Sequence, residues 1–361
     1  MNLPRWLRLS LILPLLGLNL FVLRQLLLRL APFPALFISA ALIAFLLDIP
    51  RRWLQHRGVP RPLTMVLVLG LTIGVVVLSG LWLVPRLIEQ LGELINAAPG
   101  WLEQAQNQLN LLQEKALERG IPTDLSPLTD DLLARSTRLA RSLSQQLLGL
   151  LSATLGITVN SIIVLVLAVF LLLGGESISA GLARWIPDDW RELVVGSLNR
   201  TFRGYFAGQV LLALILSALQ IVVFTLLGIP YGVLFAVAIG FTTLVPYASA
   251  LTIVLVSVLL ALDDPRTGIE VLAAAISVGQ VVDQVIQPRL MGSIVGLQPA
   301  WLLVALPIGA RVGSLMGFGD LLGLLLAVPV ASCLKTFLDA WGQQPAPEAI
   351  TEESRPLRAG G

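Results

Sequence analysis

The sequence predicts an all-α integral membrane protein with about eight transmembrane helices, two of them discontinuous, and a small extracytoplasmic helical hairpin. The first observation behind this prediction is composition. Of 361 residues, 56% are hydrophobic and only 13% are charged, whereas soluble domains carry about 25% charged residues. The second is that the apolar residues form blocks long enough to cross a bilayer core, which takes ~20 residues as a helix.

Eight apolar blocks are separated by polar or basic connections. They cover residues 10–30, 32–48, 62–84, 150–173, 207–228, 229–261, 269–290 and 299–338. The chain therefore divides into three transmembrane helices with a basic cytoplasmic loop (1–84), an extracytoplasmic amphipathic helical segment (85–149), a transmembrane transport region with broken helices (150–338), and a cytoplasmic tail (339–361). The tail is rich in proline and poor in apolar residues, which predicts disorder.

A compact basic loop sets the expected orientation. It contains Arg51, Arg52, His56, Arg57 and Arg61 and no acidic residue. Since cytoplasmic loops are enriched in Lys and Arg, we place this loop and the N-terminus in the cytoplasm. Residues 174–206 and the stretch around Arg266 then also lie inside, and residues 229–231 lie outside.

Residues 85–149 form the one sizeable region outside the predicted spans. Its apolar residues Leu102, Ala105, Leu109, Leu112 and Ala116 recur every three or four positions, which predicts one face of an amphipathic helix. Gly120 and Pro122 end this helix, and Ser126-Pro127 begins a second one. We expect the two to be antiparallel, packed on each other or on a neighbouring subunit.

Charge and the cysteine and histidine contents exclude several classes of function. The net charge of +2 comes from basic residues that sit mostly between apolar blocks, so we expect no nucleic-acid partner. One Cys and one His rule out a disulfide framework and argue against a Cys/His metal site. We expect no metal, no cofactor and no catalytic residue. The expected partners are the lipid bilayer and a small-molecule or ion substrate.

Two apolar blocks are too long to be single straight spans. Residues 229–261 would extend ~50 Å as one helix, against a bilayer core of ~30 Å, and Gly240, Thr242, Thr243 and Pro246 interrupt them near the middle. The block at 299–338 either crosses the membrane once or forms a re-entrant hairpin. Breaks of this kind are typical of substrate sites in transporters, although Gly and Pro are also simply common in membrane helices.

One predicted span carries a polar stripe. Gln280, Asp283, Gln284 and Gln287 lie at offsets of zero, three, four and seven, so they share one helix face. Because Asp near a helix centre costs ~2.5–3.5 kcal/mol on insertion scales, we expect this face to line the bundle interior or a wet path and to bind substrate or ion. The alternative is hydrogen bonding that only holds the bundle together. Arg311 is a candidate counter-charge within a second apolar stretch.

Five short motifs occur in order along the second half of the chain. They are Gly228-Ile229-Pro230-Tyr231, Leu244-Val245-Pro246-Tyr247, Gln287-Pro288-Arg289-Leu290-Met291-Gly292, Gly296-Leu297-Gln298-Pro299 and Leu326-Ala327-Val328-Pro329-Val330. Together with the layout of the spans, they resemble the autoinducer-2 exporter family, or PerM-type permeases. The resemblance implies a homo-oligomeric, multi-pass permease of the bacterial inner membrane. It also implies that Pro246 and the turn at Pro288–Gly292 belong to the transport region.

The sequence departs from this family's pattern at three places. Many members have an acidic residue where this chain has Val282; its carboxylate is Asp283, ~100° further around the helix. After Pro246-Tyr247, the usual Gly-Pro is replaced by Ser249-Ala250, and Asp320 stands at a position that is commonly glycine. We include Asp320 among the candidate binding residues.

The predicted function is export or exchange of a small polar solute or ion, with coupling to H⁺ or Na⁺ as the resemblance implies. One alternative is a non-transporting membrane scaffold. Another is an intramembrane aspartyl protease, because Gly317-Phe318-Gly319-Asp320 spells the Gly-x-Gly-Asp motif of those enzymes and Asp283 offers a second carboxyl. Against the protease, Asp283 does not follow a tyrosine and the Pro-Ala-Leu motif is missing.

Overall fold

The computed structural model describes residues 5–30, 32–118, 154–186, 188–291 and 299–342, together with Gln145 and Gly149. Every regular element in these ranges is a helix, which confirms the predicted all-α class. The predicted second amphipathic helix, the tail beyond residue 342 and Gly292 lie outside the described residues.

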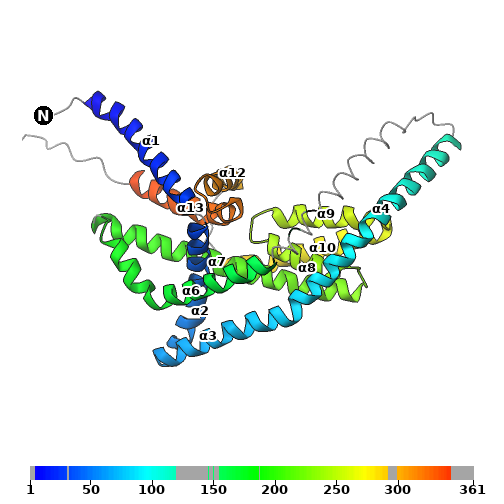
Figure 1. Cartoon of the computed structure of the whole chain (residues 1–361), viewed down its shortest axis with the longest axis horizontal. Coiled ribbons are helices and arrows are strands. Elements are labelled where there is room, and N and C mark those ends of the chain that lie inside the picture. Colours follow the sequence, from blue (N-terminus) through cyan, green and yellow to red (C-terminus); the bar gives the residue numbers. More distant parts are fainter. Residues whose placement is uncertain are drawn as a thin grey trace, which may run out of the picture.

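The helices follow one another along the chain in the order labelled in Figure 1. They are α1 (Arg5–Arg29), α2 (Phe33–His56), α3 (Arg61–Leu78), α4 (Val84–Glu118), α6 (Thr154–Ala183), α7 (Asp188–Leu226), α8 (Gly232–Thr242), α9 (Ala248–Ala261), α10 (Pro265–Val281), α11 (Gln287–Met291), α12 (Pro299–Leu315) and α13 (Asp320–Gly342). Single π-helical turns at Ser79–Leu83 and Val282–Ile286 join α3 to α4 and α10 to α11.

Within the described residues, five helical stretches are long and apolar enough to cross a membrane. They are Phe33–His56, Arg61–Ala97, Val194–Leu226, Pro265–Leu290 and Asp320–Asp339. Shorter apolar helices cover Val159–Gly175, Gly232–Thr242, Ala248–Ala261 and Ala300–Leu315. These stretches are consistent with a membrane protein, while the number of spans stays a prediction.

Helices α3 and α4 form one long rod that runs past α8, α9 and α10 (Figure 1). The side chains of Leu71 and Leu78 on α3 are exposed, as expected of a helix that faces lipid. Further along, Leu94 and Trp101 of α4 are buried in the same apolar cluster as Phe235 of α8. The amphipathic helix predicted from residue 102 therefore begins earlier, and Leu94 and Trp101 in its first part pack on the second half of the chain.

The first half of the protein is held together by small residues. Ala40 and Ala44 of α2 and Ala168 of α6 are buried in one cluster, and such residues let two membrane helices approach closely. Helix α2 also packs on α7, where Phe45 and Phe202 lie with ring centroids 6.5 Å apart. These contacts tie α2 to the centre of the molecule.

Helices α8 and α9 form a hairpin whose two ends meet beside α4. At the start of α8, the ring of Tyr231 contacts that of Trp101 at 5.8 Å between centroids. Just after α9, Asp263 faces Gln104, whose amide nitrogen lies 2.6 Å from the Asp263 Oδ1 atom once the amide is oriented as a donor. Because Trp101 and Gln104 are neighbours on α4, both ends of the segment are close together. Burial, and then the nearby charges of Glu93 and Asp263, raise the pKa of Tyr231.

The structure therefore differs from the expectation that residues 229–261 cross the membrane as one broken span. Helix α8 has 11 residues and α9 has 14, which gives lengths of ~16 Å and ~21 Å. Each is short of the ~30 Å of a bilayer core. The chain turns back at residues 243–247, so that both ends of the α8–α9 hairpin lie beside α4.

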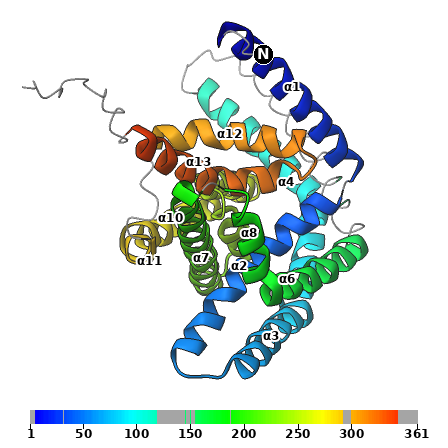
Figure 2. The ribbon, with the colours of Figure 1, turned by 90° about the vertical axis from the view of Figure 1, so that its left-hand side faces the viewer.

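Helices α12 and α13 form a second hairpin and lie side by side in Figure 2. A Cβ atom added to Gly309 would come within 2.5 Å of Ala327, and one added to Gly313 within 2.8 Å of Gly323. Only glycine permits this antiparallel contact. The hairpin form of residues 299–338, one of the two arrangements left open by the sequence, is the one observed.

Candidate functional site

The break between α8 and α9 forms the tip of the first hairpin. Helix α8 ends at Thr242, and the Thr243 N–H still donates to the Ile239 and Gly240 carbonyls at 3.2 Å. Thr242 and Thr243 also donate their hydroxyls back to the last turn of α8. Pro246 then cannot continue the helix because it has no N–H. Gly240, expected at the break, instead lies inside α8 and packs closely against Ser217 and Ala213 of α7.

Two further residues shape this tip. The buried side chain of Gln209, on α7, donates its amide to the Thr243 carbonyl, which the turn leaves without a helical partner. Tyr247 has a φ angle of +67°, a left-handed conformation that is uncommon for residues other than glycine. Strained residues of this kind persist where surrounding structure holds them, often at functional sites.

The polar stripe lies on a helix that is locally π-helical. Gln280 is in α10, Asp283 and Gln284 are in the turn Val282–Ile286, and Gln287 begins α11. The sequence predicts a turn that begins at Pro288, but the helix continues through this residue to Met291. A proline inside a helix removes a backbone hydrogen bond and clashes with the preceding turn, and the π turn immediately before it is a common way to absorb this irregularity.

A cavity of about 170 Å³ brings the tip and the polar stripe together. Gln280 and Asp283 line one wall, and Ser249 and Ala250, just after the tip, line the other. Gln284 donates its amide to the Gln280 Oε1 atom at 2.6 Å and so fixes the orientation of that side chain. Gln287 does not line the cavity. The arrangement offers a carboxylate and an amide to a small polar ligand or a cation.

The two other candidate residues lie on the second hairpin. Arg311 is exposed on α12, and Asp320 is exposed at the first position of α13. Neither lines the cavity of Asp283. Among the described residues, no ion pair joins Arg311 to Asp283, so the geometry offers no support for the expected counter-charge or for a pair of catalytic aspartates.

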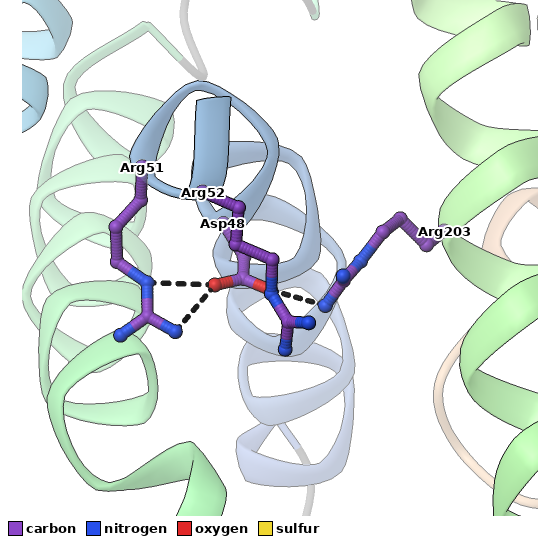
Figure 3. Close-up of polar contacts among 4 residues, drawn as sticks. All are labelled: Asp48, Arg51, Arg52 and Arg203. Atoms are coloured by element: carbon purple, nitrogen blue, oxygen red, sulfur yellow. Dashed lines mark hydrogen bonds and ion pairs between the residues drawn. The ribbon is translucent and has the colours of Figure 1, made fainter. Parts of the chain in front are cut away.

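Sequence reasoning missed a second polar cluster, at the end of α2. Asp48 is buried and accepts hydrogen bonds from Arg51 Nε at 2.7 Å, from Arg52 Nε at 2.9 Å, and from Arg203 of α7 (Figure 3). The sequence pattern predicts a role only as topology anchors for Arg51 and Arg52. Their spacing of three and four residues from Asp48 is a signal for the local pairs, but nothing in the sequence points to Arg203.

Comparison with known proteins identifies the family of this chain. The family model described as AI-2E family transporter matches residues 11–343. The chain belongs to the AI-2E transporter family. A Synechocystis protein named "Putative transport protein sll0060" is 34% identical over 93% of this chain and 96% of its own length. The Escherichia coli "Putative permease PerM" is 26% identical over 84% of this chain and 85% of its own length.

Membership confirms the resemblance seen in the sequence motifs. A Bacillus subtilis relative, "Putative transport protein YueF", is 24% identical over 84% of this chain and 82% of its own length. The family and these relatives are transporters or permeases by name, so general membrane transport is supported for this AI-2E family member. They support a multi-pass membrane protein as well.

Proposed function

We propose that this protein is a permease that exports or exchanges a small polar solute or ion, with Asp283 and Gln280 as the binding residues. The observation that carries the proposal is the cavity between the tip of the α8–α9 hairpin and the polar helix face. Asp283 is exposed on the surface of the single chain and lies in a helix long and apolar enough to cross a membrane, where a carboxylate is costly unless it is functional or paired. The described residues give Asp283 no ion-pair partner, which favours a role in binding.

The chemistry of the cavity indicates its ligand class. Asp283 supplies a negative charge, Gln280 supplies an amide, and the rest of the lining is largely apolar, including Leu216 and Ile253. Such a site suits a cation such as H⁺ or Na⁺, or a small solute that donates hydrogen bonds to a carboxylate. The family's name points to an exported signalling molecule as one such solute.

Substitution of Asp283 tests this function. Wild-type, Asp283→Asn and Glu270→Gln proteins are purified and reconstituted in liposomes. Flux of labelled solutes and of protons is then followed with and without imposed Na⁺ and pH gradients. Glu270 is the matched control because it lies on the same helix but pairs with Arg266 at the surface. We expect Asp283→Asn to lose at least about 90% of coupled flux, and Glu270→Gln to retain it.

Two outcomes would contradict the proposal. Normal flux in well-folded Asp283→Asn protein would exclude this carboxylate from the transport path. No flux of any solute or ion with the wild-type protein under all gradients would favour the non-transporting scaffold.

A further inference from the structure

The cluster near the end of α2 gathers three arginines around one described carboxylate. Buried Asp48 faces the guanidinium groups of Arg51, Arg52 and Arg203. Among the described residues, the Arg203 Nε atom is buried and has no hydrogen-bond partner, and a buried donor without an acceptor is unfavourable. The site thus has donor capacity left for an anion.

A cavity of about 290 Å³ opens beside these arginines, between α2, α6 and α7. This volume is near the lower end for small-molecule sites, which are ~300–1,000 Å³. Asp48 is the one acidic residue among the described residues of its lining. Arginine binds phosphate with a planar fork of N–H donors, so the polar end of the cavity suits a phosphate group.

Apart from Ser179 and Asn199, the rest of the lining is apolar, and it extends along α2 away from the arginines. Phe37 and Ala41 of α2 and Leu172 of α6 line it. About three helical turns, roughly 16 Å, separate Phe37 from Asp48 along α2. A free inorganic anion makes no favourable contact with this apolar wall, whereas an acyl chain packs against it.

The position of the cluster matches the surface of a bilayer. One turn beyond it, the Arg57 guanidinium stacks over the Trp53 ring at 4.0 Å from its centroid, and the nearby connection after α6 exposes Trp185. Tryptophan is enriched at the level of the lipid headgroups. Basic pockets between transmembrane helices at this level are suited to anionic lipid headgroups.

We infer that the cavity between α2, α6 and α7 binds one anionic phospholipid, with its phosphodiester on Arg52 and Arg203 and an acyl chain along Phe37 and Leu172. This site is separate from the cavity of Asp283, since the two share no lining residue. The lipid supplies an acceptor for the Arg203 Nε atom and joins α2 to α7.

The test titrates purified protein in detergent with short-chain phosphatidylglycerol, with phosphatidylcholine of the same chain length, and with inorganic phosphate. The readout is the midpoint temperature of unfolding. We expect phosphatidylglycerol to raise the midpoint saturably, at concentrations at least about tenfold lower than phosphatidylcholine. Arg52→Gln and Arg203→Gln should each raise the half-saturating concentration by about tenfold, since each removes charge-assisted hydrogen bonds.

Arg61→Gln is the matched control. It removes one exposed positive charge at the same end of the helices but outside the cavity, and it should titrate like the wild type. Equal effects of the two lipids, or equal weakening by Arg61→Gln and Arg52→Gln, would overturn the inference. A full effect of inorganic phosphate at the same concentrations would show a free-anion site instead. If Arg203→Gln fails to fold, Arg52→Gln provides the test. The Arg52 side chain is 47% exposed, so its replacement should leave the fold intact.

Discussion

Gln209 supplies a hydrogen bond that the tip of the α8–α9 hairpin needs. Its side chain is only 8% exposed and donates to the Thr243 carbonyl. Replacement by leucine leaves this carbonyl unpaired inside the bundle, at a cost of about 1–3 kcal/mol. We expect Gln209→Leu to lower the midpoint of thermal unfolding and to reduce flux. The control Gln25→Leu, on the exposed face of α1, should unfold as the wild type does; equal midpoints for both variants would argue against this role of Gln209.

Asp264 caps helix α10 and makes its stability depend on pH. Its carboxylate accepts hydrogen bonds from the Thr267 hydroxyl at 2.8 Å and from the Thr267 and Arg266 N–H groups at 3.0 and 3.2 Å. These bonds favour the ionised form and lower the pKa of Asp264. Because the folded-state pKa lies below the unfolded value of about 4, the stabilisation is present above that pH and is lost as the pH falls through the folded-state pKa.

We therefore expect Asp264→Ala to lower the unfolding midpoint at pH 7, and the gap from wild type to narrow below about pH 4. Asp264→Asn keeps a capping oxygen and has no charge to titrate, so it should stay close to wild type at pH 7. Thermal unfolding of the three proteins between pH 3 and 7 measures the difference in midpoint between each variant and the wild type. A gap between Asp264→Ala and wild type that is the same at every pH would show that the carboxylate charge contributes nothing.

At the scale of elements, the α12–α13 hairpin depends on the absence of side chains at its contact. A Cβ atom added to Gly323 would lie 2.2 Å from the Gly309 carbonyl oxygen. This atom belongs to the backbone and cannot move aside cheaply. We expect Gly323→Ala to destabilise the protein by about 1–3 kcal/mol. Gly70→Ala, on the lipid-exposed face of α3 with no atom within 4 Å, should be neutral or slightly stabilising; similar midpoints for the two variants would refute close packing of the hairpin.

Helical elements were predictable from the sequence, but their three-dimensional course was not. Block length and apolar content report that a segment is buried in a membrane, and the 3.6-residue period placed Gln280 and Asp283 on one face. Both properties are the same for a helix that crosses and for one that turns back. The hairpin of residues 229–261 follows instead from contacts such as that between Tyr231 and Trp101, which join positions far apart in the chain. The pair of Asp48 and Arg203, separated by 155 residues, was hidden for the same reason.

At the scale of the whole molecule, we expect the two hairpins to set the topology of the second half. Because the α8–α9 hairpin begins and ends beside α4, we expect residues 227–231 and 262–264 to lie on one side of the membrane. Helix α10 and its continuation to Leu290 are long enough to cross. We then expect the α12–α13 hairpin to start and finish on the opposite side. This proposed arrangement keeps the predicted cytoplasmic tail and would put the connection before Arg266 outside, whereas the charge pattern alone predicts that it lies inside.

Labelling of single cysteines distinguishes this topology from a broken sixth span. In a Cys333→Ser background, we introduce Leu227→Cys, Asp263→Cys or His56→Cys and treat intact cells with a membrane-impermeant maleimide. Because both ends of the hairpin contact α4, Leu227→Cys and Asp263→Cys should both be labelled in intact cells, and His56→Cys only after permeabilisation. If residues 229–261 instead crossed the bilayer once, Asp263→Cys would behave like His56→Cys. The tip of the hairpin would then not lie beside Asp283, since that tip exists only if the chain turns back at residues 243–247.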